Sequence, residues 1–149
     1  MTPGPCSVFV YGTLMPGERN AHVATRGGAV LAQGAGLRGY ALYHLSPEAY
    51  PALVPGPPGA TVRGQLLTYT PAAWRVALPF LDDLEGLHET PPLYTRSLVT
   101  LQLDSGGEAP GWVYVYARAE RLGQPGAQPV PSGDWRAVPG RDRPAPGER

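Results

Sequence analysis

The sequence predicts a mixed α+β protein: a small, twisted, mostly antiparallel β-barrel of about six strands with one or two flanking helices. Three observations support this class. Short runs of β-branched and aromatic residues follow one another closely. Only one stretch has convincing helical spacing. Glycine and proline number 20 and 19, whereas charged residues make up only 16% of the chain. The predicted strands are residues 7–11, 29–33, 39–45, 61–69, 94–103 and 112–117.

The helix is predicted after the fourth of these strands. Thr70 can cap its first turn, and Pro71 suits its first position. Apolar residues then recur four and three positions apart, at Trp74, Leu78 and Leu81. Because Pro79 lacks an amide hydrogen, we expect the helix to break near Leu78 and to resume as a short turn through about Leu84.

Other segments are assigned to loops or to the surface. Residues 47–58 hold several prolines and are expected to form a surface or site-lining loop. The histidines lack the spacing of metal ligands, so we interpret all three as surface or loop residues: His22, His44 and His88.

The C-terminal part is rich in proline, glycine and arginine. This composition predicts that residues 124–131 and 139–149 are extended or disordered. Trp135 lies between these segments and is expected to pack onto the body of the protein. We therefore predict one domain over residues 1–136 and an extended or disordered tail over residues 137–149.

The charge balance narrows the possible partners. The formal net charge is zero, so electrostatic attraction to nucleic acid or to an anionic membrane is absent and we expect neither partner. No apolar run is long enough to cross a bilayer, and the first residues do not form a secretory signal. A single cysteine, Cys6, rules out an internal disulfide. We expect a cytoplasmic monomer or weak homodimer with no metal site.

Residues 81–86 are a candidate for catalysis. On a helix, Leu78, Leu81 and Glu85 share one face because they are three and four positions apart, whereas Asp83 points away. The pattern that buries Leu81 therefore turns Glu85 inward. Burial raises the pKa of a carboxyl group and suits it to proton transfer near neutral pH. The alternative, that Glu85 ends the helix and faces solvent, stays open because a proline kink blurs the angle.

The first strand runs into a loop that could bind an anion. The loop consists of a tyrosine, a glycine and two further residues: Tyr11, Gly12, Thr13 and Leu14. Consecutive backbone amides at such a strand end can bind a carboxylate, and glycine lets a ligand approach the backbone. An ordinary strand-to-loop turn is the alternative.

The last predicted strand carries three aromatic residues on one face. Alternation along the strand places Trp112, Tyr114 and Tyr116 together. A tyrosine can line a polar pocket, or it can pack with its hydroxyl at the surface. We interpret Tyr114 as a packing residue and Tyr116 as a candidate for substrate binding.

Seven short motifs follow one another between about residues 7 and 136. They are VFVYGTLMPG at 8–17, YPALV at 50–54, VRG at 62–64, LDDLEG at 81–86, YTR at 94–96, WVYVY at 112–116 and SGDW at 132–135. Each motif is short, but the ordered series resembles the γ-glutamylcyclotransferase-like (AIG2-like) family, near the γ-glutamylamine cyclotransferases.

The resemblance implies a compact mixed barrel in which residues 11–14 hold the α-amino-acid end of the substrate. It implies that Glu85 is the catalytic acid/base and that Tyr94 is a pocket residue. One departure is visible. Many members have a glutamate after the glycine that matches Gly64, whereas this chain has Gln65, which puts the electrostatics of the pocket in question.

The implied reaction needs no cofactor. The α-amine of a γ-glutamyl amide attacks its own γ-carbonyl, 5-oxoproline forms and a free amine leaves. Two other readings stay open from the residues: a non-catalytic module that binds a small carboxylate or peptide, and an acyltransferase or amide hydrolase in small-molecule biosynthesis. The sequence does not name the leaving amine.

Overall fold

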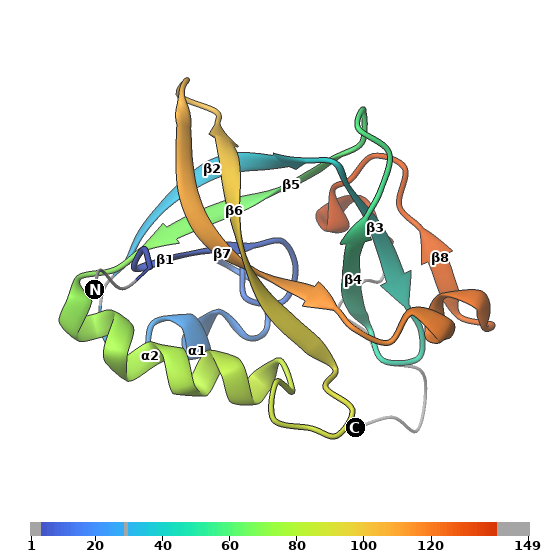
Figure 1. The fold of residues 1–149 in the computed structure, drawn as a ribbon, viewed down its shortest axis with the longest axis horizontal. Helices are drawn as coiled ribbons and strands as arrows, with labels where there is room; N and C mark the ends of the chain where they lie inside the picture. The colour runs from blue at the N-terminus through green and yellow to red at the C-terminus, as the bar shows by residue number, and fades with distance from the viewer. Residues whose placement is uncertain (1–3, 29, 140–149) are drawn as a thin grey trace.

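The computed structural model describes residues 4–28 and 30–139, which form eight strands, two α-helices and two short 3₁₀ helices (Figure 1). The strands are β1 (Ser7–Val10), β2 (Leu31–Arg38), β3 (Tyr40–Leu45), β4 (Tyr50–Pro55), β5 (Thr61–Thr68), β6 (Tyr94–Leu103), β7 (Glu108–Tyr116) and β8 (Ala127–Pro129). The α-helices are α1 (Ala21–Ala24) and α2 (Pro71–Leu84), and the 3₁₀ helices are Ala119–Gly123 and Trp135–Ala137.

Five strands close into a barrel in the order β1-β5-β2-β6-β7. Neighbouring strands are antiparallel except where β1 and β7 close the barrel in parallel. The predicted mixed α+β class and mostly antiparallel barrel are therefore confirmed. The other three strands form a second sheet in the order β4-β3-β8, which lies beside the barrel (Figure 1).

The prediction of a loop over residues 47–58 is wrong in its middle. Strand β4 forms there and pairs with β3 along its whole length. The prolines are tolerated because β4 is an edge strand, where a missing amide hydrogen need not remove a ladder bond. Ala52 and Leu53, which lie between them, are fully buried. Burial of this short apolar run outweighs the turn-forming tendency of its prolines.

Helix α2 begins as predicted but does not break. The amide of Ala73 donates to the Thr70 hydroxyl at 3.1 Å, which caps the first turn. The helix then continues through Pro79, so the expected break near Leu78 is wrong. Pro79 removes one bond, to the carbonyl of Arg75, and both residues are exposed, so water can satisfy that carbonyl.

The C-terminal part packs against the second sheet. Trp135 is fully buried, and its indole Nε1 donates to His44 Nδ1 at 3.0 Å. The packing of Trp135 is thus confirmed, whereas the surface or loop placement of His44 is wrong because β3 buries it. Part of the segment predicted to be extended or disordered forms β8 and pairs with β3. Ala29 of a predicted strand and residues 140–149 of the predicted tail lie outside the described residues.

Within the described ranges, neither α-helix combines the length and the apolar character needed to cross a bilayer.

Candidate active site

A cavity of about 80 Å³ lies where the end of β1, the start of β4, the end of α2 and the start of β6 come together. A water needs about 10–15 Å³ of such space, so the cavity can hold several waters or a small ligand group. Six of the seven predicted site residues line it: Tyr11, Gly12, Thr13, Leu14, Glu85 and Tyr94. Residues far apart in the sequence therefore share one hollow.

The loop after β1 presents backbone donors to the cavity. The amide of Met15 donates to the Gly12 carbonyl at 3.1 Å, which turns the chain. The amides of Gly12, Thr13 and Leu14 make no hydrogen bond to any described residue. Gly12 also lies against β4, because a Cβ there would be 2.3 Å from Pro51 Cγ. This close approach requires glycine and leaves consecutive amides available to an anion.

Glu85 occupies the first position after α2, and its amide still donates to the Leu81 carbonyl at 3.0 Å. Leu81 is fully buried and Asp83 is exposed, as the helical spacing predicts. Glu85 keeps some exposed surface, but it lines the cavity and burial raises its pKa to about 8. Both the lining of the cavity and the raised pKa favour the inward-facing prediction for Glu85 over the solvent-facing alternative.

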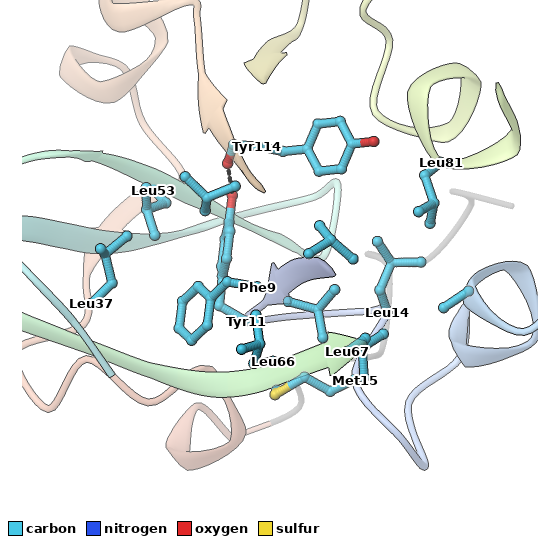
Figure 2. Packing of buried hydrophobic residues seen from close by; sticks show 14 of the residues in the cluster. Phe9, Tyr11, Leu14, Met15, Leu37, Leu53, Leu66, Leu67, Leu81 and Tyr114 are labelled. Carbon is cyan, nitrogen blue, oxygen red and sulfur yellow. Dashed lines mark hydrogen bonds between the residues drawn. The ribbon is translucent and has the colours of Figure 1, made fainter. Parts of the chain in front are cut away.

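Two tyrosines of the cavity donate their hydroxyl protons to backbone carbonyls. Tyr11 donates to the carbonyl of Tyr114 at 2.6 Å, and Figure 2 shows its hydroxyl directed at that backbone. Tyr94 donates to the carbonyl of Pro51. Burial raises the pKa of both hydroxyls well above the usual value, and the nearby Glu85 raises each further. Both side chains therefore stay neutral near physiological pH.

Tyr116, the seventh predicted site residue, is not among the residues that line the cavity. Its ring packs edge-on against Tyr94 with 5.3 Å between centroids. Its predicted contact with substrate stays a prediction, and its observed contact is with a cavity residue. Gln65 is not among the residues that line this cavity, but it pairs with Val10, which does line it.

A buried polar cluster supports the helix that carries Glu85. Asp82 pairs with Arg96 of β6 and accepts a 2.7 Å hydrogen bond from the Tyr114 hydroxyl of β7. Tyr114 lines the cavity as well as packing, which the sequence reasoning missed. The three-residue spacing of Asp82 and Glu85 could have indicated that Asp82 lies near the proposed site, because residues three positions apart neighbour each other on a helix.

Arg19 and Asn20 line the cavity but were not predicted. The amide of Asn20 donates to the Thr13 carbonyl at 2.8 Å, which folds this segment back onto the loop. The Arg19 guanidinium donates to the Ala49 carbonyl at 2.7 Å, which fixes a positive charge beside the opening. No spacing pattern marks these two residues, so only the folded loop reveals them.

Comparisons with known proteins agree with this geometry. Residues 8–137 match the model of the family described as "Gamma-glutamyl cyclotransferase, AIG2-like". A Vibrio cholerae serotype O1 protein named "Putative gamma-glutamylcyclotransferase" is 33% identical over 128 residues, which cover 86% of this chain and 93% of that protein.

Solved structures share the fold. The crystal structure of an AIG2-like protein from Mus musculus is 28% identical, with a TM-score of 0.60 over 96% of this chain and 97% of the mouse chain. A solution structure from Arabidopsis thaliana, 23% identical with a TM-score of 0.61, covers 91% of this chain and 71% of its own and shows the fold alone. The chain described here belongs to the gamma-glutamyl cyclotransferase, AIG2-like family.

Proposed function

We propose that this chain is a γ-glutamyl cyclotransferase that converts a γ-glutamyl amide into 5-oxoproline and a free amine, with Glu85 as general acid/base. One observation carries the proposal. A carboxyl group whose pKa burial raises to about 8 lines the same cavity as three backbone amides that have no partner among the described residues. Such a cavity offers a proton acceptor on one wall and an anion-binding loop on another.

The loop has the chemistry to bind the negative end of the substrate. The amides of Gly12, Thr13 and Leu14 would donate to the α-carboxylate or to the oxyanion that develops on the γ-carbonyl. Arg19 adds a positive charge beside them. Holding the flexible glutamyl chain in a folded conformer brings its amine to its own carbonyl, and such orientation lowers the barrier without further chemistry.

Glu85 would move the protons. The α-amine nitrogen bonds to the γ-carbonyl carbon, and the bond from that carbon to the leaving nitrogen breaks. The substrate ammonium loses two protons as it becomes the lactam N–H, and the leaving nitrogen gains two as it becomes an ammonium ion. Atoms and charge therefore balance with no cofactor. Because Tyr11 and Tyr94 stay neutral, Glu85 is the better candidate to take and return these protons.

The test is turnover of a panel of γ-glutamyl amines and dipeptides, with 5-oxoproline measured by mass spectrometry. We expect the wild-type protein to form the lactam from at least one compound and Glu85→Gln to lose this activity at least 100-fold. Asp83→Asn is the matched control, because Asp83 lies on the same helix but is exposed. Full activity of Glu85→Gln would remove Glu85 from the mechanism.

The same experiment separates the two alternatives. Calorimetric binding of 5-oxoproline without turnover of any compound would indicate a non-catalytic carboxylate-binding module. A product other than the lactam would indicate an acyltransferase or amide hydrolase. The leaving amine is identified by whichever compound of the panel reacts fastest. The cytoplasmic location and the monomeric or weakly dimeric state are part of the proposal and need separate measurement.

A further inference from the structure

A second cavity, of about 290 Å³, lies beside the first half of α2, whereas Glu85 follows the last residue of that helix. We call it the α2 cavity, after Trp74, Arg75 and Leu78 of the helix, which line it. Its other walls are the segment before β1, which runs beside the start of α2 (Figure 1), and side chains of β6 and β7. No described residue lines both this cavity and the one that contains Glu85.

Most of the lining of the α2 cavity is apolar and aromatic. Trp74 and Leu78 line it from the helix, and Trp112 lines it from β7. Trp112 is held in place, because its indole donates to the Pro5 carbonyl at 3.0 Å and the Arg96 guanidinium carbon lies 5.4 Å from its ring centroid. A dry cavity of about 150 Å³ binds benzene. The larger α2 cavity therefore has room for a bicyclic aromatic group.

The α2 cavity also carries a positive charge that no described residue neutralises. Arg75 is exposed and forms no ion pair with any residue that the structure describes. Arg96, the other cation of the lining, already pairs with Asp82. The described lining residues include no carboxylate. One uncompensated cation beside an apolar wall favours a ligand that is apolar and carries a single negative charge.

We propose that the α2 cavity is a second ligand site, which binds a small aryl carboxylate with its ring between Trp112 and Leu78 and its carboxylate paired with Arg75. The inference goes beyond the proposed function, because neither Glu85 nor the loop after β1 takes part. A neutral aromatic ligand would leave the charge of Arg75 uncompensated. A dianion would lack a second free cation, because Arg96 is paired with Asp82. The charge of the lining thus selects a monoanion.

The test measures binding of three probes to the full chain by calorimetry near neutral pH. Indole-3-propionate has both the ring and the charge, indole-3-propionamide has the ring alone, and acetate has the charge alone. We expect indole-3-propionate to bind about threefold to fivefold more tightly than the amide and at least about tenfold more tightly than acetate. No binding of indole-3-propionate, or equal binding of indole-3-propionate and either other probe, would overturn the proposal.

Arg75→Gln tests the assigned cation. We expect it to bring the affinities of indole-3-propionate and indole-3-propionamide to about the same value, whereas Arg75→Lys should keep most of the difference. Both variants should fold, because Arg75 is exposed. Arg38→Gln is the matched control, because Arg38 is also an exposed arginine but lies at the end of β2, outside the α2 cavity. An equal effect of Arg38→Gln would mean that net charge, and not a contact with Arg75, sets the preference.

The tryptophans report where the probe binds. The chain has three, of which Trp74 and Trp112 line the α2 cavity and Trp135 does not. In nitrogen–proton correlation spectra, we expect indole-3-propionate to shift the indole N–H signals of Trp74 and Trp112 and to leave that of Trp135 in place. A shift of Trp135 alone, or of none of the three, would contradict the assignment.

Competition separates this site from the candidate active site. We expect an excess of 5-oxoproline to leave the affinity for indole-3-propionate within about twofold of its value without 5-oxoproline, because the two cavities share no described lining residue. Displacement by 5-oxoproline would mean that both compounds bind beside Glu85 and would overturn the proposal. Failure of the proposed cyclotransferase activity would leave the α2 cavity assignment standing, because its probes are not substrates.

Discussion

The Tyr114 hydroxyl donates a 2.7 Å hydrogen bond to Asp82 Oδ1, and the same carboxylate pairs with Arg96. The three residues belong to β7, α2 and β6, so the cluster joins the last turn of the helix to the β6–β7 hairpin. Glu85 follows that turn directly. The position of the proposed acid/base therefore depends on a buried ion pair as well as on apolar packing.

Asp82→Asn tests this dependence. Asparagine can still accept from Tyr114, but Arg96 loses its ionic partner, and we expect a loss of about 2 kcal/mol in the free energy of unfolding in urea. Asp83→Asn is the control: Asp83 is exposed and its 3.9 Å pairing with His88 is at the surface, so a change within about 0.5 kcal/mol is expected. Equal changes in the two variants would mean that the buried cluster does not stabilise the helix end.

The pH dependence of stability reports on Glu85 without any substrate. Its pKa is raised from 4.5 unfolded to about 8 folded, so the folded state binds a proton that the unfolded state releases. Its contribution to stability is therefore fully present below about pH 4.5 and is lost as the pH rises to about 8, with a slope of at most about 1.4 kcal/mol per pH unit. Glu85→Gln should remove this part of the slope.

The measurement is the free energy of unfolding of the wild-type protein and of Glu85→Gln at pH 5, 6.5 and 8. The cavity also contains Arg19 and three tyrosines, Tyr11, Tyr94 and Tyr114. Burial raises the pKa of each of these tyrosines above its usual value, which moves it further from this pH window. Parallel curves for wild type and Glu85→Gln would show that the carboxyl group is ionised and well solvated throughout, and would contradict the buried assignment.

Gly12→Ala tests the close approach of the loop to β4. The added Cβ would lie 2.3 Å from Pro51 Cγ, so Pro51 or the loop must move. Because Pro51 also accepts the hydrogen bond of Tyr94, we expect a loss of about 1–3 kcal/mol in stability and weaker binding of 5-oxoproline by calorimetry. Gly59→Ala is the control, since a Cβ there meets no atom within 4 Å. If Gly12→Ala bound 5-oxoproline as tightly as the wild-type protein does, this loop would not be part of the binding site.

Trp135→Phe tests how the C-terminal part is held. The indole is fully buried and donates to His44 Nδ1 at 3.0 Å, so phenylalanine leaves a buried acceptor without this partner and a gap in the packing. We expect a loss of about 2–3 kcal/mol in thermal or urea unfolding. Trp112→Phe is the comparison: Trp112 is only partly buried and donates to the carbonyl of Pro5 at 3.0 Å, and it should cost less. A larger loss of stability in Trp112→Phe than in Trp135→Phe would mean that Trp135 does not hold the C-terminal part in place.

Local patterns in the sequence predicted much of the scaffold. The cap at Thr70 and the apolar spacing to Leu81 located the start and the buried face of α2. The same spacing predicted that Glu85 faces inward, because residues three and four positions apart share a helix face, and Glu85 does line the cavity. The wrong predictions, a break at Pro79 and a loop over residues 47–58, treated proline as decisive. Pro79 is tolerated because it is exposed and water can satisfy the freed carbonyl, and the prolines of β4 are tolerated because β4 is an edge strand.

Sequence by itself determined most strands of the barrel, the start and buried face of α2 and the order of the family motifs, because these depend on neighbours a few residues away. Tertiary structure alone decided which groups share the cavity. The pairing of Asp82 with Arg96 joins α2 to β6, and the bond from Tyr94 to Pro51 joins the barrel to the second sheet. The bond from Arg19 to Ala49 joins the segment after β1 to the segment before β4. The proton acceptors and donors of a site acquire their direction from such long-range contacts, and no local pattern encodes them.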